Sequence, residues 1–269
     1  MSAPALPPQA TLEALKQTAI KAARLAGAIL LDYARGGFRV EHKDTVNLVT
    51  DADRQAEQAV VDLLTQTYPA HQILAEERGF QRQTDSLYKW VIDPLDGTTN
   101  FAHGFPAYCV SIGLEYRGRP LLGVVFDPTR GELFVGEVGG GAFLNGTPLQ
   151  VSQTPSLNGA LLVTGFAYDI RESEQNNLNH FARFALRAQG IRRTGTAALD
   201  LCYVAAGRFD GFWELKLHPW DTAAGALIVV EAGGRVTDFT GGPFSIYGQE
   251  ILASNGRVHD EMVKVLEFT

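Results

Sequence analysis

Residues 90–101 read WVIDPLDGTTNF, an apolar run that ends in two carboxylates, Asp93 and Asp96, with a proline between them. A short apolar run bounded by turn residues is typical of a buried β-strand. Because proline cannot donate to a sheet ladder, the pattern predicts a strand end from which both carboxylates project. We expect Gly97 and Thr98 to offer backbone N–H groups there, which are suitable donors for an anion.

Two carboxylates and an anion site within one turn repel each other by several kcal/mol at intermediate dielectric unless cations lie between them. The segment therefore predicts a divalent metal ion. Oxygen ligands favour Mg²⁺, Ca²⁺ or Mn²⁺ over zinc, and Mg²⁺ commonly bridges protein carboxylates to a substrate phosphate. The alternative interpretation is an Asp-rich turn in which Asp93 and Asp96 only cap backbone amides.

Two further acidic positions are candidates for the same site. Asp221 begins an apolar, Ala- and Gly-rich segment in PWDTAAG, residues 219–225, and Glu76 lies near the end of QILAEE, residues 72–77. Aspartate at a helix start is ordinary capping chemistry, and adjacent glutamates at a strand end can simply face solvent. The residues alone leave both positions open.

The composition indicates a globular protein with a large core, because 45% of the 269 residues are hydrophobic. The net charge is −7 and no Lys/Arg stripe occurs, so we expect no direct nucleic-acid contact. The first ten residues lack the basic and apolar runs of a signal peptide or membrane span. Cys109 and Cys202 lie in apolar segments without CxxC spacing, which favours buried thiols in a reducing cytoplasm.

The hydrophobic spacing divides the chain into two lobes, about 1–150 and about 151–269. In the first, we expect helices over 11–35 and from Thr50-Asp51 to before Pro69, and then a mostly antiparallel sheet over 70–140 with a hairpin at Asn145-Gly146. The segment SQTPSLNG would connect the lobes. The second lobe should alternate strands with helices, which we place near residues 174–189, 197–207 and 221–232.

Several segments resemble the signatures of the inositol monophosphatase family, in the same order and with comparable spacing. They are AEE at 75–77, WVIDPLDGTTNFAHGFP at 90–106, LVTGF at 162–166, RRTGTAALDL at 192–201 and WDTAAGALIVVEAGG at 220–234. The resemblance covers essentially the whole chain. The chain resembles bacterial members of the extragenic-suppressor type more than it resembles the nucleotide-phosphate and histidinol-phosphate branches of the family.

This resemblance implies an α+β or α/β fold, the five-layered αβαβα sandwich of the inositol monophosphatase and fructose-1,6-bisphosphatase type, built as one catalytic unit. It also implies dependence on two to three Mg²⁺ ions, inhibition by lithium and a homodimer. A first ion would be held by Glu76, Asp93 and the Leu95 carbonyl. A second would be held by Asp93, Asp96 and Asp221, and a third, weaker ion would again involve Glu76.

The resemblance also assigns roles in binding and catalysis. Asp53 and Thr98 would position the attacking water, beside the ligands Glu76 and Asp93. Lys43 matches a lysine of a flexible loop, and Asn47 stands where some members have aspartate. The residues expected to contact the substrate are Lys43, Leu95, Asp96, Gly97, Thr98, Gly195, Thr196, Ala197, Glu214 and Asp221.

The function implied is Mg²⁺-dependent hydrolysis of myo-inositol monophosphates, small phosphate monoesters, in the cytoplasm and away from any membrane. One alternative is a broader phosphatase acting on sugar phosphates, fructose 1,6-bisphosphate or histidinol phosphate. A second is a protein-interaction role, because extragenic-suppressor-type relatives are linked to the transcription and ribosomal-RNA machinery. The acidity of the chain argues against direct RNA contact but permits a protein partner.

Overall fold

The computed structural model describes residues 6–42 and 48–267, so the predictions for Lys43 and Asn47 lie outside the described residues. The chain opens with two long helices, α1 (Gln9–Gly36) and α2 (Asp51–Thr67), separated by the antiparallel pair β1 (Val40–His42) and β2 (Leu48–Thr50). Both helices were predicted, and α2 ends before Pro69 as expected. No helix in the described part of the chain is long and apolar enough to cross a membrane.

The first large sheet has eight strands in the order β10-β9-β8-β7-β6-β5-β3-β4. Only β3 and β5 pair in parallel, which confirms the predicted, mostly antiparallel sheet. The hairpin at Asn145-Gly146 is also confirmed, between β9 and β10. The bounds are β3 (Gln72–Ala75), β4 (Gly79–Arg82), β5 (Tyr88–Asp96), β6 (Cys109–Tyr116), β7 (Arg119–Asp127), β8 (Glu132–Glu137), β9 (Gly141–Leu144) and β10 (Thr147–Pro148), with helix α3 (Thr98–Ala102) after β5.

The second sheet has five strands in the order β12-β11-β13-β15-β14, and it mixes parallel with antiparallel pairs. The strands are β11 (Leu161–Thr164), β12 (Gly190–Arg192), β13 (Gly211–Leu215), β14 (Arg235–Thr237) and β15 (Glu250–Ser254). The helices are η1 (Leu157–Gly159), α4 (Leu178–Ala185), α5 (Ala197–Ala205), α6 (Pro219–Glu231) and α7 (His259–Glu267).

One predicted helix was too long. The expected helix near 174–189 is observed only as α4, eight residues starting at Leu178. Asn177 adopts the left-handed conformation with φ 67°, which a helix interior does not accommodate, so the segment before it forms turns. Helices α5 and α6 lie at the predicted places, with Pro219 at the first turn of α6, where its missing N–H is not needed.

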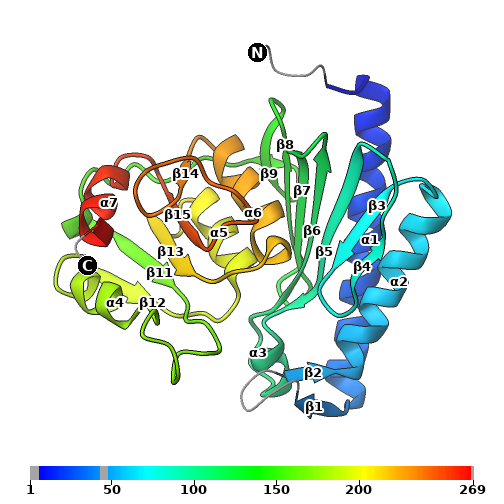
Figure 1. Ribbon diagram of the computed structural model, residues 1–269, viewed down its shortest axis with the longest axis horizontal. Helices are drawn as coiled ribbons and strands as arrows, with labels where there is room; N and C mark the ends of the chain where they lie inside the picture. The colour runs from blue at the N-terminus through cyan, green and yellow to red at the C-terminus, as the bar shows by residue number, and fades with distance from the viewer. Residues whose placement is uncertain (1–5, 43–47, 268–269) are drawn as a thin grey trace.

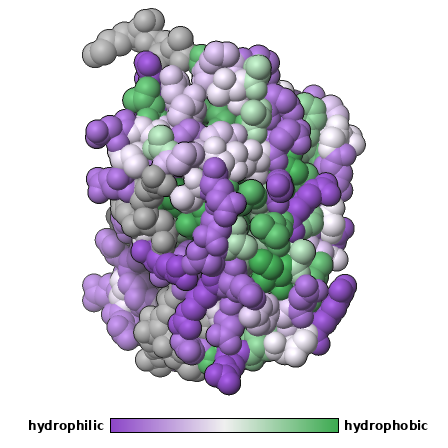
Figure 2. All heavy atoms as spheres, turned by 90° about the vertical axis from the view of Figure 1, so that its right-hand side faces the viewer, coloured by the Kyte–Doolittle hydropathy of each residue, from purple (hydrophilic) through white to green (hydrophobic). Residues whose placement is uncertain are grey.

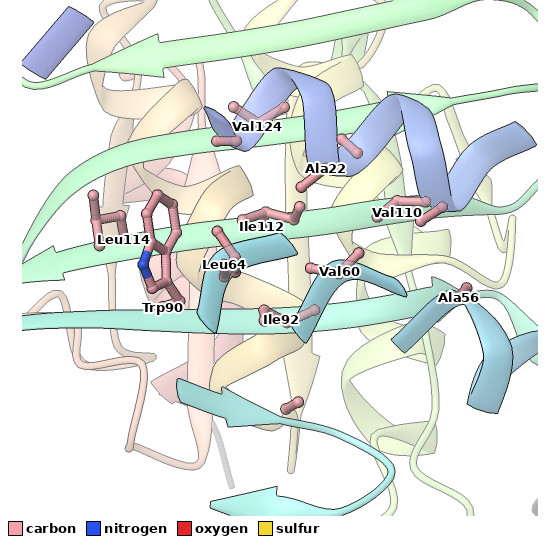
Figure 3. Close-up of a cluster of buried hydrophobic side chains, with 14 of the residues drawn as sticks. Ala22, Ala56, Val60, Leu64, Trp90, Ile92, Val110, Ile112, Leu114 and Val124 are labelled. Carbon is pink, nitrogen blue, oxygen red and sulfur yellow. The ribbon is translucent and has the colours of Figure 1, made fainter. Parts of the chain in front are cut away.

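The elements stack into five layers, which confirms the αβαβα sandwich (Figure 1). Helices α1 and α2 cover one face of the eight-stranded sheet, α5 and α6 lie between the two sheets, and α4 and α7 cover the outer face of the five-stranded sheet. Apolar side chains such as Val60, Trp90 and Ile112 fill the first interface (Figure 3). The outer face of α1 and α2 carries mostly hydrophilic side chains (Figure 2).

Three glycines bring α6 unusually close to the eight-stranded sheet. Gly113, Gly123 and Gly136 are direct neighbours across β6, β7 and β8. A Cβ atom added at Gly123 would lie 2.5 Å from the carbonyl oxygen of Ala224, and one at Gly113 would lie 2.7 Å from Cβ of Ala223. The backbone of α6 therefore rests directly on the strands, and this contact fixes where its first turn lies.

Candidate active site

A cavity of about 400 Å³ opens at the carboxyl end of β5, between the two sheets (Figure 1). Its wall is formed by the turn after β5, the loops after β11 and β13, and the starts of α5 and α6. The sequence-predicted residues that line it are Asp96, Gly97, Gly195, Thr196, Ala197, Glu214 and Asp221. Both sheets therefore contribute to one site.

The last residues of β5 include both carboxylates, Asp93 and Asp96, on either side of an irregularity in the strand, and backbone and hydroxyl donors hold them in place. Asp93 is 2% exposed, and its Oδ1 accepts a hydrogen bond from the Leu95 backbone N–H at 2.9 Å. Oδ2 of Asp96 accepts from the Thr196 hydroxyl at 2.6 Å and from the Ala198 backbone N–H at 2.7 Å. The capping interactions of the alternative interpretation are thus present, but each involves one oxygen of its carboxylate.

Four carboxylates from three distant stretches converge at this turn. Burial raises the pKa of Asp93 well above its usual range, and repulsion from Glu76, Asp96 and Asp221 adds to the rise. Burial likewise raises the pKa of Asp221, with repulsion from Asp96 and Glu76 next in size. Burial also raises the pKa of Asp96 to about 6, against the hydrogen bonds that lower it. These groups are close enough to oppose each other's ionisation.

The donor chemistry of this acidic cluster, Glu76, Asp93, Asp96 and Asp221, fits a hard divalent cation. All four side chains offer oxygen, and positive charge between them would relieve the repulsion that raises their pKa values. Over residues 6–42 and 48–267, however, no three His, Cys, Asp or Glu side chains are already arranged as a metal-binding group. The cluster is therefore a convergence of charge and not a preformed cage.

Asp53 and Thr98 lie behind the turn and contact each other. Asp53 is fully buried and accepts from the Thr98 hydroxyl at 3.1 Å through Oδ1 and from the Thr50 backbone N–H at 2.8 Å through Oδ2. The same Thr98 hydroxyl lies 3.1 Å from the Leu95 carbonyl. Burial raises the pKa of Asp53 to about 6, although these hydrogen bonds lower it. Asp53 thus caps α2 and also reaches the turn.

The opposite wall of the cavity carries another buried carboxylate, Glu214, near the end of β13. It is 7% exposed, and burial raises its pKa well above the usual range, followed by repulsion from Asp200 and Asp221. A Cβ atom at Gly165 would lie 2.2 Å from its Oε1, so only glycine fits beside the carboxylate. Asp221 differs from Glu214 because it also caps α6, accepting from the His218 backbone N–H at 2.7 Å.

The structure also brings residues to the cavity that the sequence analysis did not name. Tyr168, Asp169, Arg193, Asp200 and Lys216 all line it. The sheet topology predicts that the loops carrying Tyr168 and Lys216 line a binding site. Strands β11 and β13 are parallel, and ligands of α/β sheets bind outside the carboxyl ends of such strands.

The fold and the site define a class of layered α/β enzymes that handle anionic substrates at a buried acidic centre. The sequence model of the inositol monophosphatase family matches residues 11–268, and the chain belongs to that family. As a member it is a phosphatase, which confirms the sequence-based assignment.

Relatives and solved structures agree over nearly the full length. The chain is 46% identical over 259 residues to an inositol-1-monophosphatase of Synechocystis sp., covering 96% of this chain and 90% of the relative. It is 45% identical over 262 residues to a Pseudomonas aeruginosa protein named Nus factor SuhB, covering 95% and 97%. The structure of an inositol monophosphatase from Anabaena superposes with a TM-score of 0.87 at 45% identity, covering 95% and 96%.

Proposed function

We propose that the chain is a Mg²⁺-dependent phosphomonoesterase that hydrolyses myo-inositol monophosphates to inositol and phosphate. The observation that carries this proposal is the convergence of Glu76, Asp93 and Asp96 with Asp221 beside a cavity of about 400 Å³. A phosphate monoester brings about two negative charges to this site, and carboxylates alone would repel it. The similarity to an inositol-1-monophosphatase supports the substrate class.

The residues that would hold two to three Mg²⁺ ions are Glu76, Asp93, the Leu95 carbonyl, Asp96 and Asp221. Bound there, the ions would supply Lewis-acid activation of water and would neutralise the charge of the phosphoryl group. Thr196 and the Ala198 N–H already engage Oδ2 of Asp96. These donors orient the carboxylate that would hold the ion.

The chemistry assigned to the protein itself begins at Asp53. Its raised pKa, about 6, suits a group that must take up a proton near neutral pH. We assign the proton of the attacking water to Asp53, relayed by the Thr98 hydroxyl that donates to it. The backbone N–H groups of Gly97 and Thr98 would then donate to phosphoryl oxygens as negative charge shifts toward the leaving group.

Recognition of the polyol is assigned mainly to Glu214. A buried carboxylate accepts hydrogen bonds from vicinal hydroxyls and disfavours substrates that cannot supply them. The Thr196 hydroxyl is engaged with Asp96, so we limit its part to orienting that carboxylate. Gly195 and Ala197 form the adjoining wall through their backbone.

The test is a phosphate-release panel with inositol 1-phosphate, fructose 1,6-bisphosphate and histidinol phosphate. We expect inositol 1-phosphate to react with the highest kcat/KM, a chelator to abolish release, added Mg²⁺ to restore it and lithium to inhibit it. A preference for another substrate would select the broader sugar-phosphate or histidinol-phosphate alternative. Release that persists in chelator would overturn the metal assignment.

A second candidate function is a protein-interaction role in transcription. It is favoured by the 45% identity to the protein named Nus factor SuhB. In a deletion strain with a growth defect, rescue by a catalytically inactive variant would support this role, and rescue by the active chain alone would contradict it. We also propose a cytoplasmic homodimer, which fractionation and light scattering of the purified chain would test.

A further inference from the structure

Tyr168 belongs to the loop that follows β11 and lines the same cavity as Asp96 and Asp221. Its side chain is 51% exposed, so the ring lies at the mouth of the cavity. Burial is nevertheless the largest cause of the rise in its pKa. Tyr168 is therefore partly exposed and partly enclosed by the cavity that it lines.

The acidic cluster contributes most of the negative charge that acts on the hydroxyl. After burial, the groups that raise the pKa of Tyr168 most are the four members of the acidic cluster, with Glu76 first. Tyr168 therefore shares the cavity with Asp96 and Asp221, the two members of the acidic cluster that line it.

This hydroxyl is a donor that the protein leaves unused. Among the residues that the structure describes, it forms no hydrogen bond, although it faces carboxylates. The loop that carries it is anchored on both sides. Asn177 donates to the Gly165 carbonyl at 2.8 Å, and Lys216 pairs with Asp169 at 2.6 Å. A donor held in place without a partner inside a binding cavity is suited to a ligand.

We propose that the Tyr168 hydroxyl donates a hydrogen bond to a non-bridging oxygen of the phosphoryl group, which makes Tyr168 a further substrate-binding residue. This inference rests on the proposed phosphatase function. Because the phenol stays protonated at neutral pH, it remains a donor throughout the working range. Because every substrate and the product phosphate share the phosphoryl oxygens, the contact would support binding of all of them alike.

The experiment compares wild type with Tyr168→Phe, which removes only the hydroxyl. The control is Tyr247→Phe, because Tyr247 is also 51% exposed but donates to Glu115, outside the cavity. We expect Tyr168→Phe to raise KM for inositol 1-phosphate by about 10- to 100-fold, the range for a hydrogen bond to a charged group. kcat should change little, since the contact exists before and during the reaction. The control should keep the wild-type KM.

Binding of inorganic phosphate, measured by titration calorimetry with Mg²⁺ present, provides a readout independent of turnover. We expect the same loss of affinity in Tyr168→Phe as in KM. Unchanged KM and phosphate affinity in this variant would overturn the inference, as would a loss confined to inositol 1-phosphate, which would place the hydroxyl on the polyol. If the wild type released no phosphate from any monoester, the proposed function itself would fail, whatever the variant did.

Discussion

The substitution Gly123→Ala tests whether the contact between α6 and the eight-stranded sheet places Asp221, the proposed metal ligand. Its added methyl group would lie 2.5 Å from the Ala224 carbonyl oxygen and 2.9 Å from the Ala224 Cα. Ordinary contacts begin near 3.4 Å, so the helix must retreat by roughly 1 Å. Ala224 lies one turn from Asp221 on the same helix, so the carboxylate would move with it.

Two magnitudes follow from this shift. Overpacking against backbone atoms, which cannot rotate away, should lower the free energy of unfolding by about 1–3 kcal/mol. A displacement of about 1 Å at a catalytic group should lower kcat/KM by on the order of 100-fold. Urea denaturation measures the first, and phosphate release from inositol 1-phosphate measures the second.

The matched control is Gly36→Ala, at the end of α1, where an added Cβ atom meets no other atom within 4 Å. This variant should keep the wild-type turnover and a free energy of unfolding equal to or slightly above wild type, since alanine favours helices. If Gly123→Ala matched the control in both measurements, the glycine contact would not be what places Asp221, and our account of the site's assembly would be wrong.

Three further variants test separate parts of the molecule. Asp96→Asn keeps the shape of the side chain but removes a charge, so phosphate release should fall at least about 100-fold while the melting temperature in chelator stays at or above wild type. Glu214→Gln should raise KM for inositol 1-phosphate by about tenfold and leave the affinity for inorganic phosphate unchanged. Burial lowers the pKa of His259 to about 4 from 6.5, so protons bind the unfolded state first as pH falls from 6.5 toward 4, and stability is lost in that window. Wild type should therefore lose about 2 kcal/mol more than His259→Gln between pH 7.5 and pH 5 in urea titrations, and equal losses would contradict the assignment.

Much of the fold could be predicted because its signals are local. The helical spacing of α1, the alternation in the eight-stranded sheet and the Asn145-Gly146 turn all depend on neighbours in sequence. The error at α4 is also local in origin, since apolar spacing does not reveal that Asn177 takes the left-handed conformation. The strand at 250–254, which pairs with two others, was not named because its partners are distant.

The site was harder to predict from residues alone, because its contacts join remote positions. The carboxylate of Asp96 is oriented by Thr196, one hundred residues away, and nothing near either residue indicates the pairing. The resemblance supplied the candidate residues, while the structure supplied a contact for Thr196 that directs its hydroxyl to Asp96. Tyr168 was missed because a tyrosine in a loop carries no signal until the sheet topology places that loop at the cavity.

The repulsion within the acidic cluster lowers the stability of the fold, while the same charges would bind the cations that the proposed function needs. Burial and repulsion from neighbouring carboxylates, Glu76 and Asp96 among them, raise the pKa of both Asp93 and Asp221, so folding without a cation works against this repulsion. The glycines beneath α6 let its backbone rest on the strands, because an added side chain there would press against Ala223, Ala224 or Ile228. A ligand that binds only the folded state offsets such a cost in proportion to its affinity. The acidic cluster would therefore cost stability that a bound cation would offset, and the same concentration of charge would repel a phosphate ester in the absence of such a cation.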